Sequence, residues 1–381
     1  MRVGIEGSGA TGTAYQDHRE GAGHVLMTLD AVGGVWRYAM DLAEGLGLLG
    51  YRFTFAGFGP RPSGAQQREA EALGRVVWFD APLDWTAGHE SELDVVPELL
   101  RALVTDSDID MVHLNLPSQA CGLVLPVPVL VVSHSCVVTW FAAVRQSAVP
   151  PDWQWQFRRN RQGLDGANLV LAPSRAHAAM LVDSYGPIAN LDVVYNGARP
   201  VAGSADKTNV VFAAGRWWDE GKNGAVLDAA AGQASWPVVM AGSVRGPNGQ
   251  QFTIANAQAL GELAHGEILQ RMSEAAIVAS PSIYEPFGLA PLEAAQVGAA
   301  LVLADIPTYR ELWNDAALFA PANDVDLFAE ALNRLAGDAA LRQELSTRAQ
   351  KRAAEYTLER QARSMQAVYD RVRGVRALEF A

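Results

Sequence analysis

Cysteine is nearly absent from this chain, whose 381 residues include only Cys121 and Cys136. Two cysteines exclude a disulfide scaffold and a four-cysteine zinc site, and they favour a reduced, cytoplasmic protein. The seven histidines show none of the short spacings that bind metals. We therefore predict no metal site built from the side chains of this protein.

Basic residues are also few, with 30 lysines and arginines against 42 acidic residues and a net charge of −12. This charge excludes the broad basic surface of a nucleic-acid-binding protein. It also disfavours adsorption to anionic lipid, although it leaves room for a local peripheral membrane contact. No apolar run is long enough to cross a bilayer, and the polar N-terminus lacks the apolar core of a signal peptide. The hydrophobic fraction of 49% is typical of a globular protein.

Short apolar runs alternate with amphipathic segments along the chain, from His24–Leu29 to Leu191–Tyr195. Continuous apolar runs are typical of strands that helices cover on both faces of a parallel sheet. The pattern restarts at Asn209–Ala214 and continues to Ala317–Ala320. The sequence therefore predicts the α/β class, with two doubly wound parallel-sheet domains in series.

We expect five regions. They are a flexible N-terminal extension (1–23), a first domain (24–196), a linker (197–207), a second domain (208–357) and a C-terminal helical segment (358–381). In parallel sheets, ligands bind outside the carboxyl ends of the strands. Two such domains that face one another would enclose a ligand cleft.

Two motifs, one glycine-rich and one acidic, do not have the structural context that ligand binding requires. Gly7–Gly12 matches the G-x-G-x-x-G dinucleotide pattern, but residues 13–23 lack the apolar face of the helix that should follow. The D-x-D pairs in Asp106–Asp110 precede the predicted strand Met111–Leu114 and so lie at its amino end. A flexible tail and a solvated loop are the favoured interpretations.

Aromatic residues near arginines have two interpretations. Arg158, Arg159 and Arg161 lie beside several aromatic residues and indicate the charged face of an amphipathic helix, or else a lipid or glycan contact. Trp140 follows a predicted strand closely enough to stack on a sugar, although it also fits a core position.

The segment Ser280–Val297 contains two glutamates, Glu285 and Glu293, eight residues apart. Eight helical steps give about 80° of rotation and roughly 12 Å of rise, which is too far for a close acid–base pair. The spacing instead suits hydrogen bonds to opposite ends of an elongated polyhydroxyl ligand, such as two sugars joined by a diphosphate.

The amides of Phe287, Gly288 and Leu289 lie at the predicted start of the helix that contains Glu293. Amides at a helix start have no intrahelical acceptor and bind anions well. Gly288 allows close approach of a ligand to the backbone. This segment therefore predicts an anion site between the two glutamates.

Cations follow the first strand of the second domain, in the segment Ala214–Asn223. Arg216 and Lys222 leave the carboxyl edge of the sheet on one short loop, where they could bind a diphosphate. The chain has only three lysines, so a lysine at this position is an uncommon choice. It is consistent with a need for a compact positive charge.

Two further signals come from the first domain. Gly33 and Gly34 follow its first strand and remove side chains where a ligand or the facing domain must come close. His134 follows the strand Val127–Ser133. All of these signals fall on the carboxyl edge of a predicted sheet.

Together, these motifs make residues 24–375 resemble the retaining, two-domain nucleotide-sugar glycosyltransferases of family 4, the group 1 glycosyltransferases. The motif Glu285-Pro286-Phe287-Gly288-Leu289…Glu293 matches the E-x₇-E of that family. Weaker support comes from Gly215-Arg216…Lys222, Gly33-Gly34, Tyr195-Asn196-Gly197 and Ala304–Leu312.

The resemblance implies the GT-B architecture, in which two Rossmann-like domains face across a cleft. The first domain would bind the acceptor and the second the nucleotide-sugar donor, with a last helix that crosses back onto the first domain. The resemblance also implies no obligatory metal and no cofactor beyond the donor. The acceptor would be a hydroxyl group of a glycan, a lipid or a small molecule.

The resemblance also assigns roles residue by residue. Arg216 and Lys222 would neutralise the donor diphosphate, and Glu293 would bind the ribose hydroxyls. Glu285 and the amides from Phe287 to Leu289 would hold the transferred sugar and the distal phosphate. The remaining assignments place His134 beside the reacting sugar and Gly33 and Gly34 beside the phosphates or the acceptor.

Other activities share parts of this pattern. A sugar-nucleotide epimerase or a glycosyl phosphorylase can use the same two-domain architecture. A nicotinamide-dependent oxidoreductase is the alternative from a different class, and it depends on Gly7–Gly12 alone.

Overall fold

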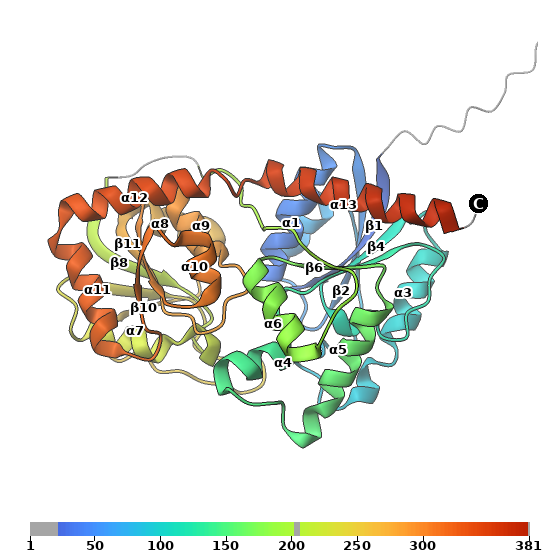
Figure 1. Cartoon of the computed structure of the whole chain (residues 1–381), viewed down its shortest axis with the longest axis horizontal. Helices are drawn as coiled ribbons and strands as arrows, with labels where there is room; N and C mark the ends of the chain where they lie inside the picture. The colour runs from blue at the N-terminus through green and yellow to red at the C-terminus, as the bar shows by residue number, and fades with distance from the viewer. Residues whose placement is uncertain (1–21, 202–205, 380–381) are drawn as a thin grey trace, which may run out of the picture.

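The computed structural model describes residues 22–201 and 206–379, and within these ranges the strands form two parallel sheets, of seven and six strands (Figure 1). In spatial order, the first sheet consists of β3 (Arg75–Trp78), β2 (Tyr51–Phe58), β1 (Gly23–Asp30), β4 (Met111–Leu114), β5 (Val129–Val132), β6 (Leu169–Ala172) and β7 (Leu191–Val193). The second consists of β10 (Gln258–Gly261), β9 (Val238–Ala241), β8 (Thr208–Ala214), β11 (Ala275–Ser280), β12 (Ala300–Ala304) and β13 (Ala317–Ala320).

Helices lie between most of the successive strands. Those of the first domain are α1 (Gly34–Gly47), α2 (Gly64–Glu71), α3 (Val96–Thr105), α4 (Val137–Trp140), α5 (Gln154–Gly166) and α6 (Arg175–Tyr185). Those of the second are α7 (Gly224–Ala231), α8 (His265–Glu274), α9 (Leu289–Gln296), α10 (Pro307–Trp313), α11 (Val325–Gly337) and α12 (Ala339–Ala353). The long helix α13 (Leu358–Glu379) follows them.

Each sheet is buried on both faces, as its continuous apolar runs predict. In β1, Leu26 belongs to the core on one face of the sheet, and Val25 and Met27 belong to the core on the other face. Successive strand side chains point to opposite faces, so a strand between two helical layers must be apolar throughout. The second domain repeats this arrangement, with Val278 and Ile277 of β11 in opposite cores.

The helix α13 lies along the first domain beside α1 (Figure 1). Met365 and Tyr369 are buried in the same core as α1. A Cβ on Gly45 would lie 2.9 Å from the Cβ of Ala362, so the glycine lets the two helices approach closely. The chain thus passes from the second domain back onto the first.

Three elements differ from the sequence-based expectation. The sequence pattern predicts one helix over Glu92–Val104. The structure instead has a 3₁₀ turn η1 (Glu90–Leu93) followed by α3, which has Pro97 in its first turn. Proline is favourable in a first turn but not inside a helix, so α3 begins there. The sequence pattern does not indicate β10, because this strand is largely exposed at the sheet edge and lacks an apolar run. Nor does the pattern indicate the helix α10, although Thr308 and Tyr309 are buried in it.

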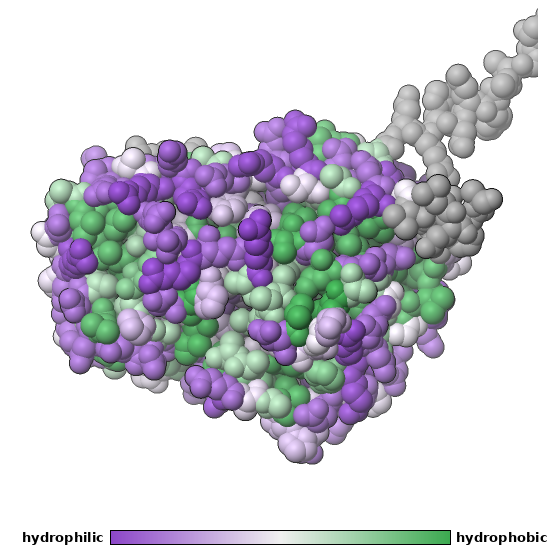
Figure 2. All heavy atoms as spheres, in the orientation of Figure 1, coloured by the Kyte–Doolittle hydropathy of each residue, from purple (hydrophilic) through white to green (hydrophobic). Residues whose placement is uncertain are grey.

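The N-terminal boundary differs slightly from the prediction, because β1 begins at Gly23 rather than at His24. The motif Gly7–Gly12 lies outside the described residues. Figure 2 shows hydrophilic and hydrophobic residues intermingled on the face that it presents. Within residues 22–201 and 206–379, no helix is both long and apolar enough to cross a membrane.

Candidate functional site

The predicted site residues of the second domain follow two strands that are neighbours in its sheet. Arg216 and Lys222 follow β8, and Glu285 and Gly288 follow β11. Between β8 and β11 the spatial order of the strands changes direction, and ligands of open α/β sheets bind outside such a point. The equivalent position in the first sheet lies between β1 and β4, and Gly33 follows β1.

Lys222 and Glu285 form an ion pair. Lys222 Nζ lies 2.5 Å from Glu285 Oε2, and their side chains are only 21% and 15% exposed. The amides of Ile283 and Tyr284 both donate hydrogen bonds to the carbonyl of Gly221, at 2.9 and 3.3 Å. The two loops therefore form one unit, and the pair is more shielded from water than an ordinary surface salt bridge.

Arg216 reaches from the second domain to the loop that follows β1. Its Nη1 donates to the carbonyl of Val32 at 3.1 Å, and its Nη2 lies 3.4 Å from Asp219 Oδ2. A Cβ on Gly33, which has φ of 102°, would lie 2.5 Å from Nη1. Gly33 therefore permits this close approach. The sequence predicts such a role for both Gly33 and Gly34. Gly34 is exposed, and a Cβ placed on it would meet no atom within 4 Å, so it plays no such packing role.

The loop after β11 ends in the helix start that the sequence predicts. Gly288 precedes α9 with φ of 97°, and a Cβ there would lie 2.9 Å from Tyr309 Cε1. Phe287 is buried in the core of the second domain. Within the described part of the chain, the amides of Phe287, Gly288 and Leu289 donate no hydrogen bond to a protein acceptor. Amides in this state at a helix start favour an anion.

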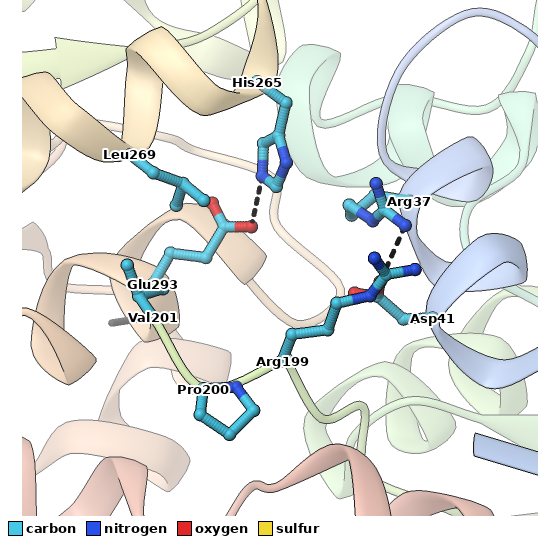
Figure 3. Close-up of a pocket in the computed structure, with 8 residues that line it drawn as sticks. All are labelled: Arg37, Asp41, Arg199, Pro200, Val201, His265, Leu269 and Glu293. Atoms are coloured by element: carbon cyan, nitrogen blue, oxygen red, sulfur yellow. Dashed lines mark hydrogen bonds and ion pairs between the residues drawn. The ribbon is translucent and has the colours of Figure 1, made fainter. Parts of the chain in front are cut away.

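Glu293 and Glu285 have different partners. Glu293 faces His265, whose Nε2 lies 2.8 Å from Glu293 Oε1 (Figure 3). Both residues line a cavity of about 230 Å³ between the domains. The other lining residues are Arg37, Asp41, Arg199, Pro200, Val201 and Leu269.

The first-domain wall of this cavity is an ion cluster. Asp41 Oδ1 lies 2.7 Å from Arg37 Nη2 and 2.7 Å from Arg199 Nε. Burial raises the pKa of the Asp41 carboxyl, although both arginines oppose that effect. The cluster ties α1 to Arg199, in the segment where the chain passes between the domains. Arg37 and Asp41, four residues apart on one helix, form a pair that sequence spacing could have revealed.

His134 follows β5 and is held by a neighbouring amide. Its Nε2 lies 2.9 Å from Asn115 Oδ1, and its ring packs edge-on against Tyr38 at 4.1 Å between centroids. Asn115 Nδ2 donates to the Thr28 carbonyl, so its Oδ1 must accept the proton from His134 Nε2. Burial, together with His113 and His177, lowers the pKa of His134 to about 3. The ring is therefore neutral at neutral pH, with Nδ1 as its acceptor atom.

Asp30 is an ionisable group near the site that the sequence-based site does not include. It ends β1, is 5% exposed and accepts a hydrogen bond from the Val32 amide at 2.8 Å. Burial raises the pKa of Asp30 to about 6, while the Val32 amide and Arg216 lower it. Neither Asp30 nor His265 has a sequence motif, because only the fold brings them beside the other groups.

The basic residues of α5 are neutralised within the first domain. Arg159 is buried and pairs with Asp94 at 3.0 Å, and Arg158 pairs with Glu90 at 3.1 Å. Arg161 pairs with Asp165. These pairs favour the interpretation of this segment as one face of an amphipathic helix.

Other polar contacts join the two domains outside this edge. Glu311 accepts from the amides of Arg175 and Ala176 at the start of α6, at 2.9 and 2.7 Å, and from the hydroxyl of Tyr195 at 2.7 Å. Closer to the site, Ser174 Oγ donates to the carbonyl of Pro286 at 2.7 Å. Directional hydrogen bonds therefore fix the two domains against one another on more than one side of the site.

The sequence of the chain matches two family models. Residues 32–200 match Glycosyltransferase Family 4, and residues 198–352 match Glycosyl transferases group 1. No curated protein matches significantly in sequence. The family models therefore cover most of the described chain without a close curated relative.

Solved structures share the fold at low sequence identity. Sucrose-phosphate synthase from Thermosynechococcus elongatus has a TM-score of 0.76 and 16% identity, over 93% of this chain and 100% of that one. HepE from Anabaena, in complex with UDP and glucose, has a TM-score of 0.73 and 18% identity, over 91% and 99%. WaaG, a glycosyltransferase involved in lipopolysaccharide biosynthesis, has a TM-score of 0.69 and 13% identity, over 91% and 99%. The two parallel sheets thus form a GT-B fold, and the chain belongs to glycosyltransferase family 4, the group 1 transferases, as a retaining, nucleotide-sugar-dependent enzyme.

Proposed function

We propose that this enzyme moves a sugar from a nucleoside-diphosphate donor to a hydroxyl group of an acceptor, with retention at the anomeric carbon and without an obligatory metal. The observation that supports this proposal most is the placement of Lys222 and Arg216 on the loop beside Glu285. Lys222 pairs with Glu285, and Arg216 lies on the same loop as Lys222. The amides of the α9 start follow Glu285 directly.

This arrangement suits a diphosphate leaving group. When the bond between the anomeric carbon and the phosphate oxygen breaks, its electrons stay on the diphosphate and the sugar becomes oxocarbenium-like. Lys222, Arg216 and the helix start would stabilise the additional negative charge. Because these groups are already in place, little reorganisation of solvent is needed as the charge develops.

Glu285 has two roles in this proposal. Its carboxylate fixes the position of the Lys222 ammonium at 2.5 Å before the donor arrives. Its remaining oxygen could accept hydrogen bonds from the hydroxyls of the transferred sugar. The acceptor would attack from the side of the leaving group, so that the new bond has the configuration of the old one.

Glu293 and His265 suit the nucleoside end of the donor. A carboxylate can accept from both hydroxyls of a ribose, and Glu293 borders the cavity between the domains. His134, neutral and hydrogen-bonded to Asn115, would line the sugar side. Closure of the domains around both ends would exclude water and limit donor hydrolysis.

One of the fold neighbours indicates which donors to test first. Because HepE has been solved with UDP-glucose, UDP-sugars are the first donors to test. The acceptor is a glycan, a lipid or a small molecule, reached from the first domain. A thermal-shift panel of nucleoside diphosphates and nucleotide sugars would identify the base, since a bound ligand raises the melting temperature by mass action.

The direct test compares Lys222→Ala and Glu285→Gln with Lys351→Ala. Loss of a positioned charge should reduce the transfer rate by about 100-fold or more in the first two variants. Lys351 is exposed on α12 and serves as the matched lysine, with no change expected. Wild-type rates in both site variants, or an inverted anomer in the product, would contradict the proposal.

A further inference from the structure

A short segment of the first domain contacts both donor loops of the second. It consists of α4 and the π-helical turn η3 (Phe141–Arg145). We propose that Thr139 and Trp140 are positioning residues, which set the orientation of Arg216 and Glu285 through contacts across the domain boundary. This inference rests on the proposed function, because it assigns these loops to the donor.

Trp140 acts on the loop that contains Arg216. Its indole Nε1 donates to Asp219 Oδ1 at 2.9 Å. The same oxygen accepts from the amide of Gly221 at 2.9 Å, and the other oxygen lies 3.4 Å from Arg216 Nη2. Asp219 therefore connects the first domain, its own loop and Arg216, and loss of the indole donor would leave its orientation less restricted.

The fit of the indole against this loop is close. A Cβ on Gly221 would lie 3.0 Å from Trp140 Nε1, which is shorter than most contacts that Cβ atoms make in proteins. The sequence suggests that Trp140 either stacks on a sugar or fills the core. The structure instead gives its ring nitrogen a specific carboxylate partner in the other domain.

Thr139 acts on the loop that contains Glu285. The hydroxyls of Thr139 and Tyr284 lie 2.7 Å apart, and both residues are buried. Thr139 already donates to the carbonyl of Cys136, so Tyr284 is the donor in this contact. Because a buried hydroxyl without a partner is costly, the contact restricts Tyr284, the residue directly before Glu285.

The two contacts act on one unit. The amides of Ile283 and Tyr284 bond to the carbonyl of Gly221, which joins the loops of Glu285 and Lys222. A displacement of either loop would therefore be transmitted to the other. The segment that follows His134 thus couples contact between the domains to the geometry of the groups assigned to the diphosphate.

The test uses UDP as the probe and measures its dissociation constant by calorimetry. Trp140→Phe and Tyr284→Phe, which each remove one hydrogen-bond donor and keep an aromatic ring, should each weaken UDP binding by about fivefold to tenfold. Asn248→Ala is the matched control. It removes a 3.2 Å contact to the Trp85 carbonyl, which also crosses between the domains but is exposed and outside the donor loops. Its affinity for UDP should not change.

A double-mutant cycle separates positioning from general loosening. If Trp140 acts through Asp219, the variant with both Trp140→Phe and Asp219→Ala, which removes the acceptor oxygen, should bind UDP no more weakly than Asp219→Ala alone. Additive losses in the cycle, or wild-type affinity in Trp140→Phe, would overturn the inference. If Trp140→Phe lowers the melting temperature, the affinity of Tyr284→Phe for UDP becomes the deciding measurement, since that variant loses a single oxygen atom.

Failure of the proposed function gives a different result. In that case the wild-type protein would bind UDP but transfer no sugar from any nucleotide sugar, and the binding cycle would still report whether Trp140 and Asp219 are coupled. Normal sugar transfer together with additive losses in the cycle would overturn only the positioning role of Trp140.

Discussion

Gly33 of the first domain lies against the guanidinium of Arg216 of the second, where a Cβ atom would come within 2.5 Å of Nη1. The same guanidinium donates to the carbonyl of Val32. Two residues that are far apart in the sequence therefore depend on one another at the domain boundary. The absence of a side chain at one position is what allows the cation at the other to reach the first domain.

Replacement of Gly33 by alanine should displace Arg216 and strain a backbone with φ of 102°. The strain should cost about 1–3 kcal/mol of stability. The displacement of Arg216 should lower kcat/KM by roughly tenfold to 100-fold. Gly122→Ala is the control, because Gly122 also has positive φ, at 71°, but no neighbour near its Cβ position. It should cost stability and spare activity. Equal activity in the two variants would show that the clash with Arg216 is unimportant.

Glu293→Gln should weaken UDP binding by about tenfold, because the carboxylate that faces His265 would lose its charge and part of its acceptor capacity. The affinity for inorganic pyrophosphate should stay the same, since Glu293 is assigned to the nucleoside and not to the phosphates. Calorimetry with both ligands measures the difference. A parallel loss for UDP and pyrophosphate would contradict that assignment.

Asp30 should make the stability of the protein depend on pH. Its pKa is about 6 in the folded protein and has an ordinary value of 3.8. Between these values the folded state binds more protons than the unfolded state, so the free energy of unfolding falls as pH rises through this window. Asp30→Asn lacks this loss, and its stability relative to wild type should increase by up to about 3 kcal/mol between pH 4 and pH 7.5. Urea denaturation at the two pH values tests this, and an unchanged difference would argue against it.

Tyr369→Phe should destabilise the attachment of α13. The hydroxyl of Tyr369 lies 2.7 Å from Nδ1 of the buried His113. Burial lowers the pKa of His113 to about 3, so the ring stays neutral and would lose a hydrogen-bond partner without gaining a proton. The expected loss is about 1–3 kcal/mol in the free energy of unfolding. Glu359→Gln, in an exposed pair on the same helix, should change stability by about 0.5 kcal/mol or less. Similar losses in both variants would contradict the role of the buried bond.

Much of the fold can be predicted because each sheet is covered on both faces. A strand such as β12 (Ala300–Ala304) must then be apolar at every position, and such runs are visible in the sequence. The edge strand β10 has no such requirement, which is why its sequence does not mark it as a strand. Helix starts are predicted well where one residue type explains them, as with Gly288 before α9.

The sequence likewise predicts some residues of the candidate site and not others. Lys222 and Glu285 come from loops after two strands that the sequence identifies, and the structure shows them in contact. The partners of the other predicted residues come from distant segments. His265 contacts Glu293, Asn115 contacts His134, and nothing in the local sequence around either partner marks it.

The sequence by itself determined most of the strands and helices, although not β10 or α10, and it determined which polar groups follow the strands at their carboxyl ends. These properties depend on local spacing and on burial of each segment. The tertiary structure alone decided which groups meet across the two domains: Arg216 against Gly33, Tyr284 against Thr139, and Asp219 against Trp140. Such contacts depend on how two packed domains are oriented, and the free energy that sets this orientation is spread over many distant residues, so no short motif records it.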